Sequence, residues 1–357
     1  MLHNLRLSRI PKDNQLQAWN AADELLLKRH DEIQGKTLLI NDSFGALALS
    51  LNSHEIHWWN DSATSFEALT LNAQINNLPM PDLVTPPLNQ QYFDTIIIQI
   101  PKSVNYFAWQ LEIIKPQLNK GATVLALGMT KHISAAHIKA MKDRFHQVNP
   151  GRAEKKARVI SLSEPNDQVI PAKNGKYNNP LTNEEIIVLP GCFAEKNIDP
   201  GARAFIAYFE SLPKVKKVLD LGCGNGILSQ AFTSIQPDTE IHLTDDSQQA
   251  LESAKLNLSN KMNCFFYHSN GLNRVNTARF DLILCNPPFH QSTTITESIA
   301  QKMITDATEN LSENGELWLV ANRHLDYRKT LKRHFHSIKI VSKEARFNVI
   351  QCQKLTT

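Results

Sequence analysis

The chain has 357 residues, of which 42% are hydrophobic and 20% are charged, the composition of an ordinary globular protein with full cores. This length predicts about two domains. The net charge of +3 is mildly basic, which is compatible with an anionic partner but does not require one.

The cysteines and the apolar runs exclude several classes of protein. The 5 cysteines are odd in number, widely spaced and without a C-x-x-C pair, which argues against a disulfide framework or a zinc site. No apolar run reaches the roughly 18 residues of a membrane span, and the N-terminus lacks the apolar core of a signal peptide. We therefore expect a cytoplasmic protein with no metal site and no membrane partner, and we favour a monomer.

The first half of the chain alternates predicted helices and strands. A helix is predicted over 13–32, where Leu, Trp and Ala recur at helical spacing after Asp13 or Asn14 as a cap. A second helix is predicted over 62–76. Short apolar runs predict buried strands at 36–42, 54–61, 93–102 and 122–128. Strands that alternate with helices indicate a largely parallel sheet.

The second half repeats this pattern. Strands are predicted at 216–222, 239–246, 264–270, 280–286 and 315–322, with helices at 248–260 and 299–311. Four segments of the first half match four of the second: 38–48 with 218–228, 56–62 with 241–247, 93–101 with 280–288, and 118–127 with 311–320. We interpret this as two copies of one α/β domain, although any two α/β domains share some of this spacing.

The predicted domains are 1–150 and 186–357, joined by a linker or β-ribbon at 151–185 that is rich in Pro, Asn, Lys and Gly. The linker carries a positive cluster that is either a solvated surface or a contact for a phosphate backbone: Arg152, Lys155, Lys156 and Arg158.

A glycine-rich turn follows the first strand of the second copy. Gly222, Gly224 and Gly226 stand between this strand and a helix, where they let a ligand approach main-chain N–H groups. Asp245 ends the next strand, 19 residues after Gly226, as does the ribose-binding acid of nucleotide-binding folds. The pair predicts a ribose-bearing cofactor, whereas the turn alone is a weak signal.

The spacing of this turn does not fit a dinucleotide. Ile227 stands where G-x-G-x-x-G requires its last glycine. The pattern G-x-G-x-G, with Asp220 two residues before it, resembles class I S-adenosylmethionine-dependent methyltransferases. The resemblance implies S-adenosyl-L-methionine as cofactor, with Asp220 facing its methionine end and Asn270 its adenine. It further implies a covering element at 189–206 that includes Phe193, Asp199, Gly201 and Arg203. Asn270 could instead form a turn, and Arg203 could be an ordinary surface residue.

The sequence CNPPFH, 285–290, ends the fourth strand of the second copy at the same sheet edge. The Asn286 side-chain oxygen and the Pro287 carbonyl can accept the two N–H bonds of an exocyclic amine and hold it towards a methyl sulfonium. The prolines stiffen this backbone, and Phe289 offers a flat face on which a base can stack. The alternative is a strand terminator with an aromatic plug.

The sequence NPPFH, with GELWLVANRHLDY at 315–327, resembles the bacterial ribosomal RNA guanine-N2 methyltransferases. That family implies two tandem Rossmann-like class I methyltransferase domains, the first degenerate, each a mostly parallel seven-stranded sheet flanked by helices. It also implies a role for His290 in the choice of guanine. The segments 16–27, 41–48 and 286–291 are more similar to the large-subunit branch, which implies a guanine in 23S rRNA as substrate. One departure is that Asp246 follows Asp245, so either acid could meet the ribose.

The first copy has lost the residues of the predicted site. The alignment places Asn60 at the position of Asp245 and Gln99-Ile100-Pro101 at that of 286–288. It places three residues at the positions of Gly222, Gly224 and Gly226: Asp42, Phe44 and Ala46. We expect this domain to bind no S-adenosylmethionine and to orient RNA or support the fold.

Three other functions fit the same residues. They are methylation of guanine N2 in 16S rRNA, methylation of a protein glutamine, and RNA binding or ribosome assembly without catalysis. The basic stretch 323–335 is a further candidate for RNA contact or for a solvated helix face.

Overall fold

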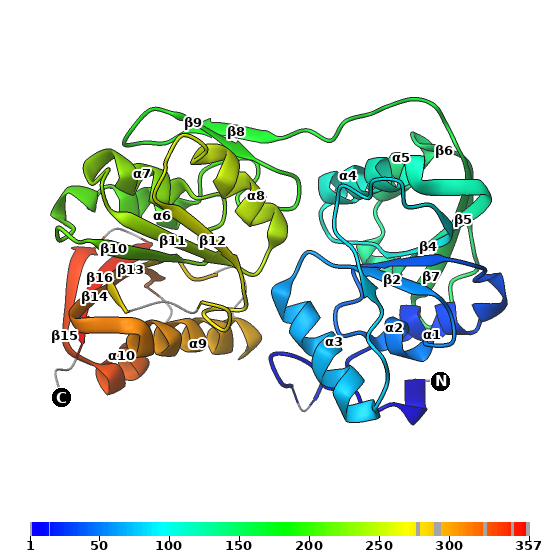
Figure 1. The fold of residues 1–357 in the computed structure, drawn as a ribbon, viewed down its shortest axis with the longest axis horizontal. Coiled ribbons are helices and arrows are strands. Elements are labelled where there is room, and N and C mark those ends of the chain that lie inside the picture. Colours follow the sequence, from blue (N-terminus) through cyan, green and yellow to red (C-terminus); the bar gives the residue numbers. More distant parts are fainter. Residues whose placement is uncertain are drawn as a thin grey trace. The chain divides into compact units, whose positions relative to one another are not determined.

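The computed structural model describes residues 2–13, 15–275, 279–288, 294–323, 327–343 and 346–354. The chain divides into two compact units, Met1–Lys173 and Asn174–Thr357 (Figure 1). None of the helices in the described ranges is long and apolar enough to cross a membrane.

The first unit is a sheet covered by helices on both faces. Its strands are β1 (Thr37–Ile40), β2 (Ile56–Trp59), β3 (Asp82–Leu83), β4 (Phe93–Gln99), β5 (Leu118–Met129), β6 (Phe145–Pro150) and β7 (Ala157–Pro165). Its α-helices are α1 (Ala21–Leu27), α2 (Ala46–Ser50), α3 (Ala63–Asn76), α4 (Val104–Ile114) and α5 (Ala135–Lys142). The order is β3-β2-β1-β4-β5-β7-β6, and β7 is antiparallel to both neighbours. Apolar residues of α1–α3 pack on one face, and those of α4 and α5 pack on the other.

The second unit begins with a hairpin of β8 (Gly175–Asn178) and β9 (Glu185–Val188). Its other strands are β10 (Lys217–Leu221), β11 (Glu240–Asp245), β12 (Cys264–His268), β13 (Phe280–Cys285), β14 (Leu311–Asn322), β15 (Phe335–Lys343) and β16 (Phe347–Lys354). Its α-helices are α6 (Pro200–Ile206), α7 (Ile227–Ile235), α8 (Gln248–Asn257), α9 (Thr294–Asn310) and α10 (Arg328–His334). The sheet order is β12-β11-β10-β13-β14-β16-β15, the same as in the first unit.

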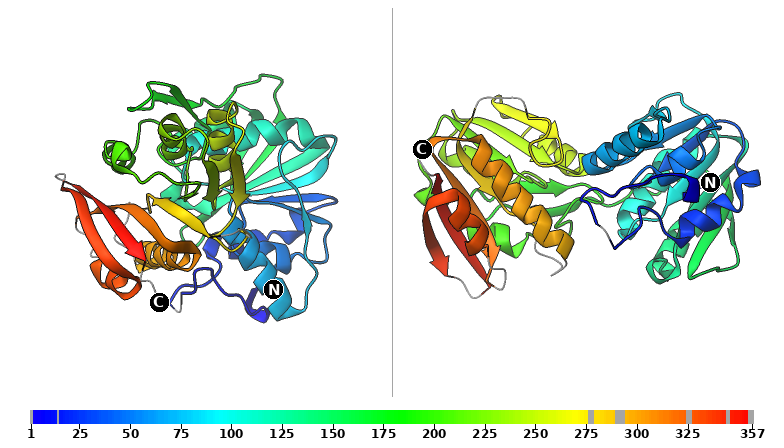
Figure 2. Two further views of the ribbon diagram at one scale, coloured as in Figure 1. Left: turned by 60° about the vertical axis from the view of Figure 1, so that its left-hand side comes forward. Right: turned by 90° about the horizontal axis from the view of Figure 1, so that it is seen from below.

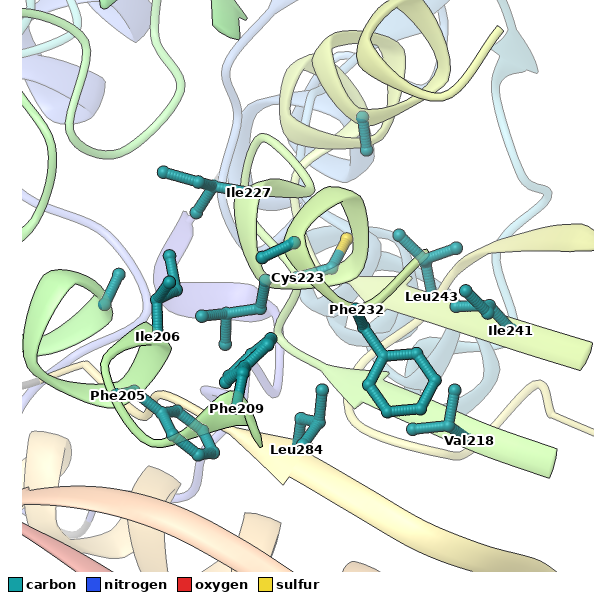
Figure 3. Close-up of a cluster of buried hydrophobic side chains, with 14 of the residues drawn as sticks. Phe205, Ile206, Phe209, Val218, Cys223, Ile227, Phe232, Ile241, Leu243 and Leu284 are labelled. Atoms are coloured by element: carbon teal, nitrogen blue, oxygen red, sulfur yellow. The ribbon is translucent and has the colours of Figure 1, made fainter. Parts of the chain in front are cut away.

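These two sheets confirm the predicted fold class. Each contains seven strands within the described residues, mostly parallel. In the second unit, α6–α8 cover one face and α9–α10 the other (Figures 1 and 2). The strands read as continuous apolar runs because both of their faces are buried. Figure 3 shows Phe205, Phe209 and Phe232 in the apolar cluster between these helices and the sheet, and truncating one to alanine would cost about 3–5 kcal/mol.

Two predicted boundaries differ from the structure. The first helix begins at Ala21, because Asn20 caps it together with Asp23 and residues 15–20 are not helical. The expected linker 151–185 is largely structured. Its first part forms β7 inside the first sheet, and its last part forms the hairpin of the second unit, so the change of unit falls at 173–174.

Strand register corrects the alignment of the two copies. Leu38 pairs with His57 in the first sheet, and Leu219 pairs with His242 in the second. Because His57 and His242 are matched residues of the repeat, Leu38 corresponds to Leu219 rather than to Val218. The apolar runs fit equally well at either offset, since strands buried on both faces lack the alternation that would fix their register.

The predicted equivalents of the glycines are therefore wrong by one residue. In place of Asp42, Phe44 and Ala46, the residues that correspond to Gly222, Gly224 and Gly226 are Asn41, Ser43 and Gly45. Gly45 and Gly226 each precede the first residue of a helix, with φ of 76° and 78°. With this register, Asn60 still corresponds to Asp245 and Gln99 still corresponds to Asn286, as predicted.

Candidate active site

The predicted site lies at the carboxyl edge of the second sheet. Leu221, the last residue of β10, pairs with Thr244 of β11 and with Cys285, the last residue of β13. The glycine turn and Asn286 follow β10 and β13, and Asp245 ends β11, so they meet at one edge, the usual ligand position in parallel sheets.

The glycine turn leaves open space at its centre. Gly224 has a φ of 54°, and a Cβ added there would meet nothing within 4 Å. Its N–H donates to Asp245 Oδ2 at 2.8 Å, which joins the turn to the end of β11. Asp245 Oδ1 accepts from the Ser247 N–H at 2.9 Å. The Asp245 carboxylate is thus held at the turn, where ribose hydroxyls could donate to it, which favours Asp245 over Asp246.

Asp220 is a buried carboxyl on β10. Its Oδ2 accepts a hydrogen bond from the Ser229 hydroxyl at 2.7 Å, whereas Oδ1 has no partner among the described residues. Burial raises the pKa of Asp220 to about 7, against the hydrogen bonds from Ser229. A buried carboxyl with one oxygen unpaired is suited to a cationic ligand such as an ammonium group.

The Asn286 amide has a fixed orientation. Its Nδ2 donates to Asp199 Oδ2 at 3.0 Å, and its Oδ1 is buried with no partner among the described residues. Asp199 is itself held as the N-cap of α6, where Oδ2 accepts from the Ala202 N–H at 2.9 Å. A carboxylate accepts only, so the amide must turn its nitrogen towards Asp199 and its oxygen away. Asn286 Oδ1 is therefore a buried acceptor without a hydrogen-bond donor among the described residues.

The neighbours of Asn286 are described in part. Pro287 is buried and Pro288 is exposed, both outside β13. Phe289 and His290 lie outside the described residues, so their predicted roles stay predictions.

The remaining predicted cofactor residues lie at different places. Asn270 stands two residues after β12, at the same sheet edge as Asp245. Phe193 is half-exposed in the segment that precedes α6. Arg203 is exposed on α6, where it lines a surface pocket with Tyr177 and Phe347 rather than with the glycine turn.

Sequence reasoning missed two contacts. Asp199 was included in the covering element, but nothing in the sequence showed that its carboxylate would bind the Asn286 amide. Tyr177, in the expected linker, accepts a hydrogen bond at its hydroxyl from Asn225 of the glycine turn at 2.5 Å. Both contacts join residues more than 40 positions apart, for which a single sequence carries no signal.

The corresponding edge of the first sheet is filled by its own side chains. Gln99, at the position of Asn286, donates to Asp23 Oδ1 at 2.8 Å. Asn41, at the position of Gly222, donates to the Gln99 carbonyl at 2.8 Å and exchanges hydrogen bonds with the Gln110 amide. Leu39, buried, replaces Asp220. Gln99 thus has partners among the described residues for both its side chain and its main-chain carbonyl.

Both parts of the chain match known family models. Residues 183–351 match the methyltransferase small domain, and residues 2–166 match the RLMG N-terminal domain.

Curated relatives extend over nearly the whole chain. Ribosomal RNA large subunit methyltransferase G of Shewanella putrefaciens is 35% identical over 98% of this chain and 97% of its own length. The protein of the same name from Pseudoalteromonas translucida is 32% identical over 98% and 96%. Among solved structures, a T. thermophilus 16S rRNA N2 methyltransferase (RsmC) in complex with AdoMet and guanosine has the same fold. It is 21% identical, with a TM-score of 0.77 over 94% of this chain and 92% of its own.

Proposed function

The chain belongs to the ribosomal RNA large subunit methyltransferase G family, and we propose that it methylates the N2 amine of a guanine in 23S rRNA. It is an S-adenosylmethionine-dependent methyltransferase. The name of its relatives supports the large-subunit RNA, and the acceptors at Asn286 and Pro287 support an amine as the group that is methylated. Ribosomal RNA as substrate implies a cytoplasmic enzyme.

The residues at the sheet edge fit this cofactor, whose sulfonium supplies an electrophilic methyl group. Asp220 offers its unpaired, buried Oδ1 to the ammonium of the methionine end. Asp245, held at the turn by Gly224 and Ser247, offers its carboxylate to the ribose hydroxyls. The space at Gly224 lets the ligand approach the main chain.

The acceptors of the site direct the amine. The N2 lone pair of guanine is delocalised into the ring, so the amine must be held in place to react. Asn286 Oδ1 and the Pro287 carbonyl each take one N–H bond, which leaves the third direction of the nitrogen for the methyl group. No strong base is required, since the proton can leave after transfer. Such positioning can supply about 7–11 kcal/mol of the barrier.

One observation carries this proposal: the Asn286 amide is oriented by Asp199 and keeps its oxygen buried and unpaired. Leaving such an oxygen without a donor costs about 1–3 kcal/mol. If Asn286 only ended a strand, nothing would offset this free energy. In a site that binds an amine, the hydrogen bond from the substrate offsets it.

The proposal is tested by methyl transfer in vitro. The full chain is incubated with methyl-labelled S-adenosylmethionine and with ribosomal RNA and total protein from cells that lack this protein. We expect label in 23S rRNA as N2-methylguanosine. Label in 16S rRNA would indicate the small-subunit activity, and label in protein a glutamine methyltransferase. RNA binding without any label would indicate a non-catalytic factor.

The first unit has a different proposed role. Its site is filled by Asn41, Gln99 and Asp23, so it binds no cofactor. It orients the RNA or supports the fold of the second unit. A calorimetric stoichiometry of one cofactor per full chain would support this assignment, and two would refute it.

A further inference from the structure

A pocket of about 620 Å³ opens on the outer side of α6, in the second unit. Its floor is the exposed side of that helix, and its walls come from β8, from the loop before α6 and from the start of β16. The polar and aromatic residues that line it are Tyr177, Asn178, Asn197, Arg203, Arg346 and Phe347. Gly222, Gly224 and Asp245 are not among its lining residues, so it is distinct from the cofactor site.

The lining is positively charged. Arg203 and Arg346 are both exposed, and neither forms an ion pair with a carboxylate in the part of the chain that the structure describes. None of the described residues that line the pocket carries a carboxylate. The Arg323 backbone adjoins that of Arg346, because its N–H donates to the Arg346 carbonyl at 3.1 Å. Planar guanidinium groups without partners suit phosphate oxygens.

The lining is also partly aromatic. Tyr177 and Phe347 are half-buried, packed against the core on one side and lining the pocket on the other. Asn178 and Asn197 are exposed and bring amide donors and acceptors. Cations along a groove with aromatic faces and amides are the combination that single-stranded nucleic acid binds, through phosphates and stacked bases.

The pocket adjoins the Asn286 site in three ways. Pro200, on its floor, directly follows Asp199, which binds the Asn286 amide. The Tyr177 hydroxyl accepts from Asn225 of the glycine turn. Phe347 pairs with Asn322 at the end of β14, the strand next to β13. A chain of nucleotides that presents its base at Asn286 would therefore pass this pocket.

We propose that the pocket binds the single-stranded nucleotides that flank the target guanine, with phosphates on Arg203 and Arg346 and a base on Phe347 or Tyr177. This inference rests on the proposed function and assigns Arg203 to RNA rather than to the cofactor. A flanking anchor accounts for how the enzyme keeps one guanine unstacked, since contacts to its neighbours offset the cost of removing it from the stack.

The double variant R203A/R346A tests the proposal. Its matched control is K214A/K216A, which removes two exposed cations at the opposite, amino edge of the sheet. The substrate is ribosomal RNA from cells that lack the protein. We expect R203A/R346A to raise KM for RNA about tenfold, with kcat within twofold and cofactor Kd unchanged, and to lower the salt dependence of binding by about 1.4 units of log slope, since each lost contact to a single-strand phosphate removes about 0.7. R203K/R346K should restore most of the binding, and the control should match the wild type.

Three results would overturn the inference. An unchanged KM for RNA would show that the pocket does not bind substrate. A lower affinity for the cofactor would show that Arg203 binds the cofactor rather than RNA. An equal loss in K214A/K216A would show an effect of net charge only. If the wild-type chain methylates no RNA, it is the proposed function that fails, and loss of transfer to protein in R203A/R346A would identify a peptide as the occupant.

Discussion

In the first unit, Asn41, Gln99 and Asp23 hydrogen-bond with one another at the carboxyl edge of the sheet, whereas in the second unit a carboxyl oxygen and an amide oxygen at that edge have no partner among the described residues. Asn41, Gln99 and Asp23 form a chain of hydrogen bonds in the first. In the second, Asp220 Oδ1 and Asn286 Oδ1 have no partner among the described residues. The chain therefore contains the same fold twice, once with these side chains paired and once with two unpaired oxygens. Those two oxygens are the atoms to which a ligand would donate hydrogen bonds.

The glycine turn separates structural from ligand-binding glycines. Both units keep the third glycine, because a Cβ at Gly226 would lie 2.9 Å from the Ala254 Cβ and one at Gly45 would lie 2.4 Å from Leu69. The first unit has replaced the other two glycines, which leaves its packing intact. A Cβ at Gly224 would meet no atom within 4 Å, so we propose that this glycine serves the ligand, whereas one at Gly222 would lie 2.9 Å from the Met303 Cε.

An asparagine amide with three backbone hydrogen bonds is common to both units. Asn72 bonds the Ser8 backbone at both its N–H and its carbonyl, and also the Phe44 carbonyl. Asn257 makes the same three bonds, to both groups of Ile187 and to the Asn225 carbonyl. The same three hydrogen bonds therefore support the turn in both units.

The largest contrast is expected between Asn286→Ala and Gln99→Ala. The first removes an acceptor that holds the amine, so kcat should fall about 100- to 1,000-fold, as when one preorganised hydrogen-bonding group is removed elsewhere. Gln99→Ala changes only the sheet edge of the first unit, so activity per folded chain should stay within about twofold. The measurement is single-turnover methyl transfer, with circular dichroism to confirm folding. Similar losses in both variants would break the distinction between the units.

The next contrast concerns Asp199 and Asp23, the carboxylates that accept from the side-chain amides of Asn286 and Gln99. Asp199→Ser keeps an N-cap for α6 but is too short to hold Asn286, so kcat should fall about tenfold while cofactor Kd stays unchanged. Asp199→Asn keeps an acceptor oxygen and should retain most activity. Asp23→Ser should lower the melting temperature and leave kcat alone. A cofactor Kd that rises in Asp199→Ser would instead place Asp199 at the cofactor.

Alanine at the glycines should separate packing from binding. Gly226→Ala and Gly45→Ala should each lose about 1–3 kcal/mol of stability beyond the cost of their backbone conformation, because a neighbouring helix must move. Gly224→Ala meets no atom, so it should cost only about 1 kcal/mol for its positive φ, yet it should weaken cofactor binding. Denaturant unfolding and calorimetry give the two readouts. Normal cofactor affinity in Gly224→Ala would contradict the assignment of this glycine.

The smallest expected effect is a pH dependence of cofactor affinity. Protonated Asp220, with a pKa of about 7, cannot pair with an ammonium, so affinity should rise about tenfold from pH 6 to pH 8. In the protein without cofactor, the free energy of unfolding depends on pH in the opposite direction. The folded chain holds a proton at Asp220 that the unfolded chain releases at lower pH, so the free energy of unfolding falls as pH rises towards 7. Asp220→Asn should flatten both curves, and a wild-type affinity that does not change with pH would contradict the role of Asp220.

Much of the fold follows from the sequence, because buried parallel strands leave apolar runs and strand ends leave polar residues. The same burial hides register, which is why Phe44 was aligned with Gly224 although it lies opposite Asn225. β7 was assigned to a linker because its turn-rich neighbours dominate the local composition. Gly222, Gly224, Asp245 and Asn286 could be proposed as site residues, since each ends or follows a strand. The hydrogen bond from Asn286 to Asp199 and the pocket at Arg203 could not, because they depend on packing between distant segments.

The central claim is that the second unit alone methylates a guanine N2 in 23S rRNA. It is tested most directly by nucleoside mass spectrometry of mapped 23S rRNA fragments from cells that lack this protein, complemented with the wild type, with Gln99→Ala or with Asn286→Ala. We expect one N2-methylguanosine to disappear on deletion, to return with the wild type and with Gln99→Ala, and to stay absent with Asn286→Ala. An identical set of modified guanines in all of these cells would contradict it.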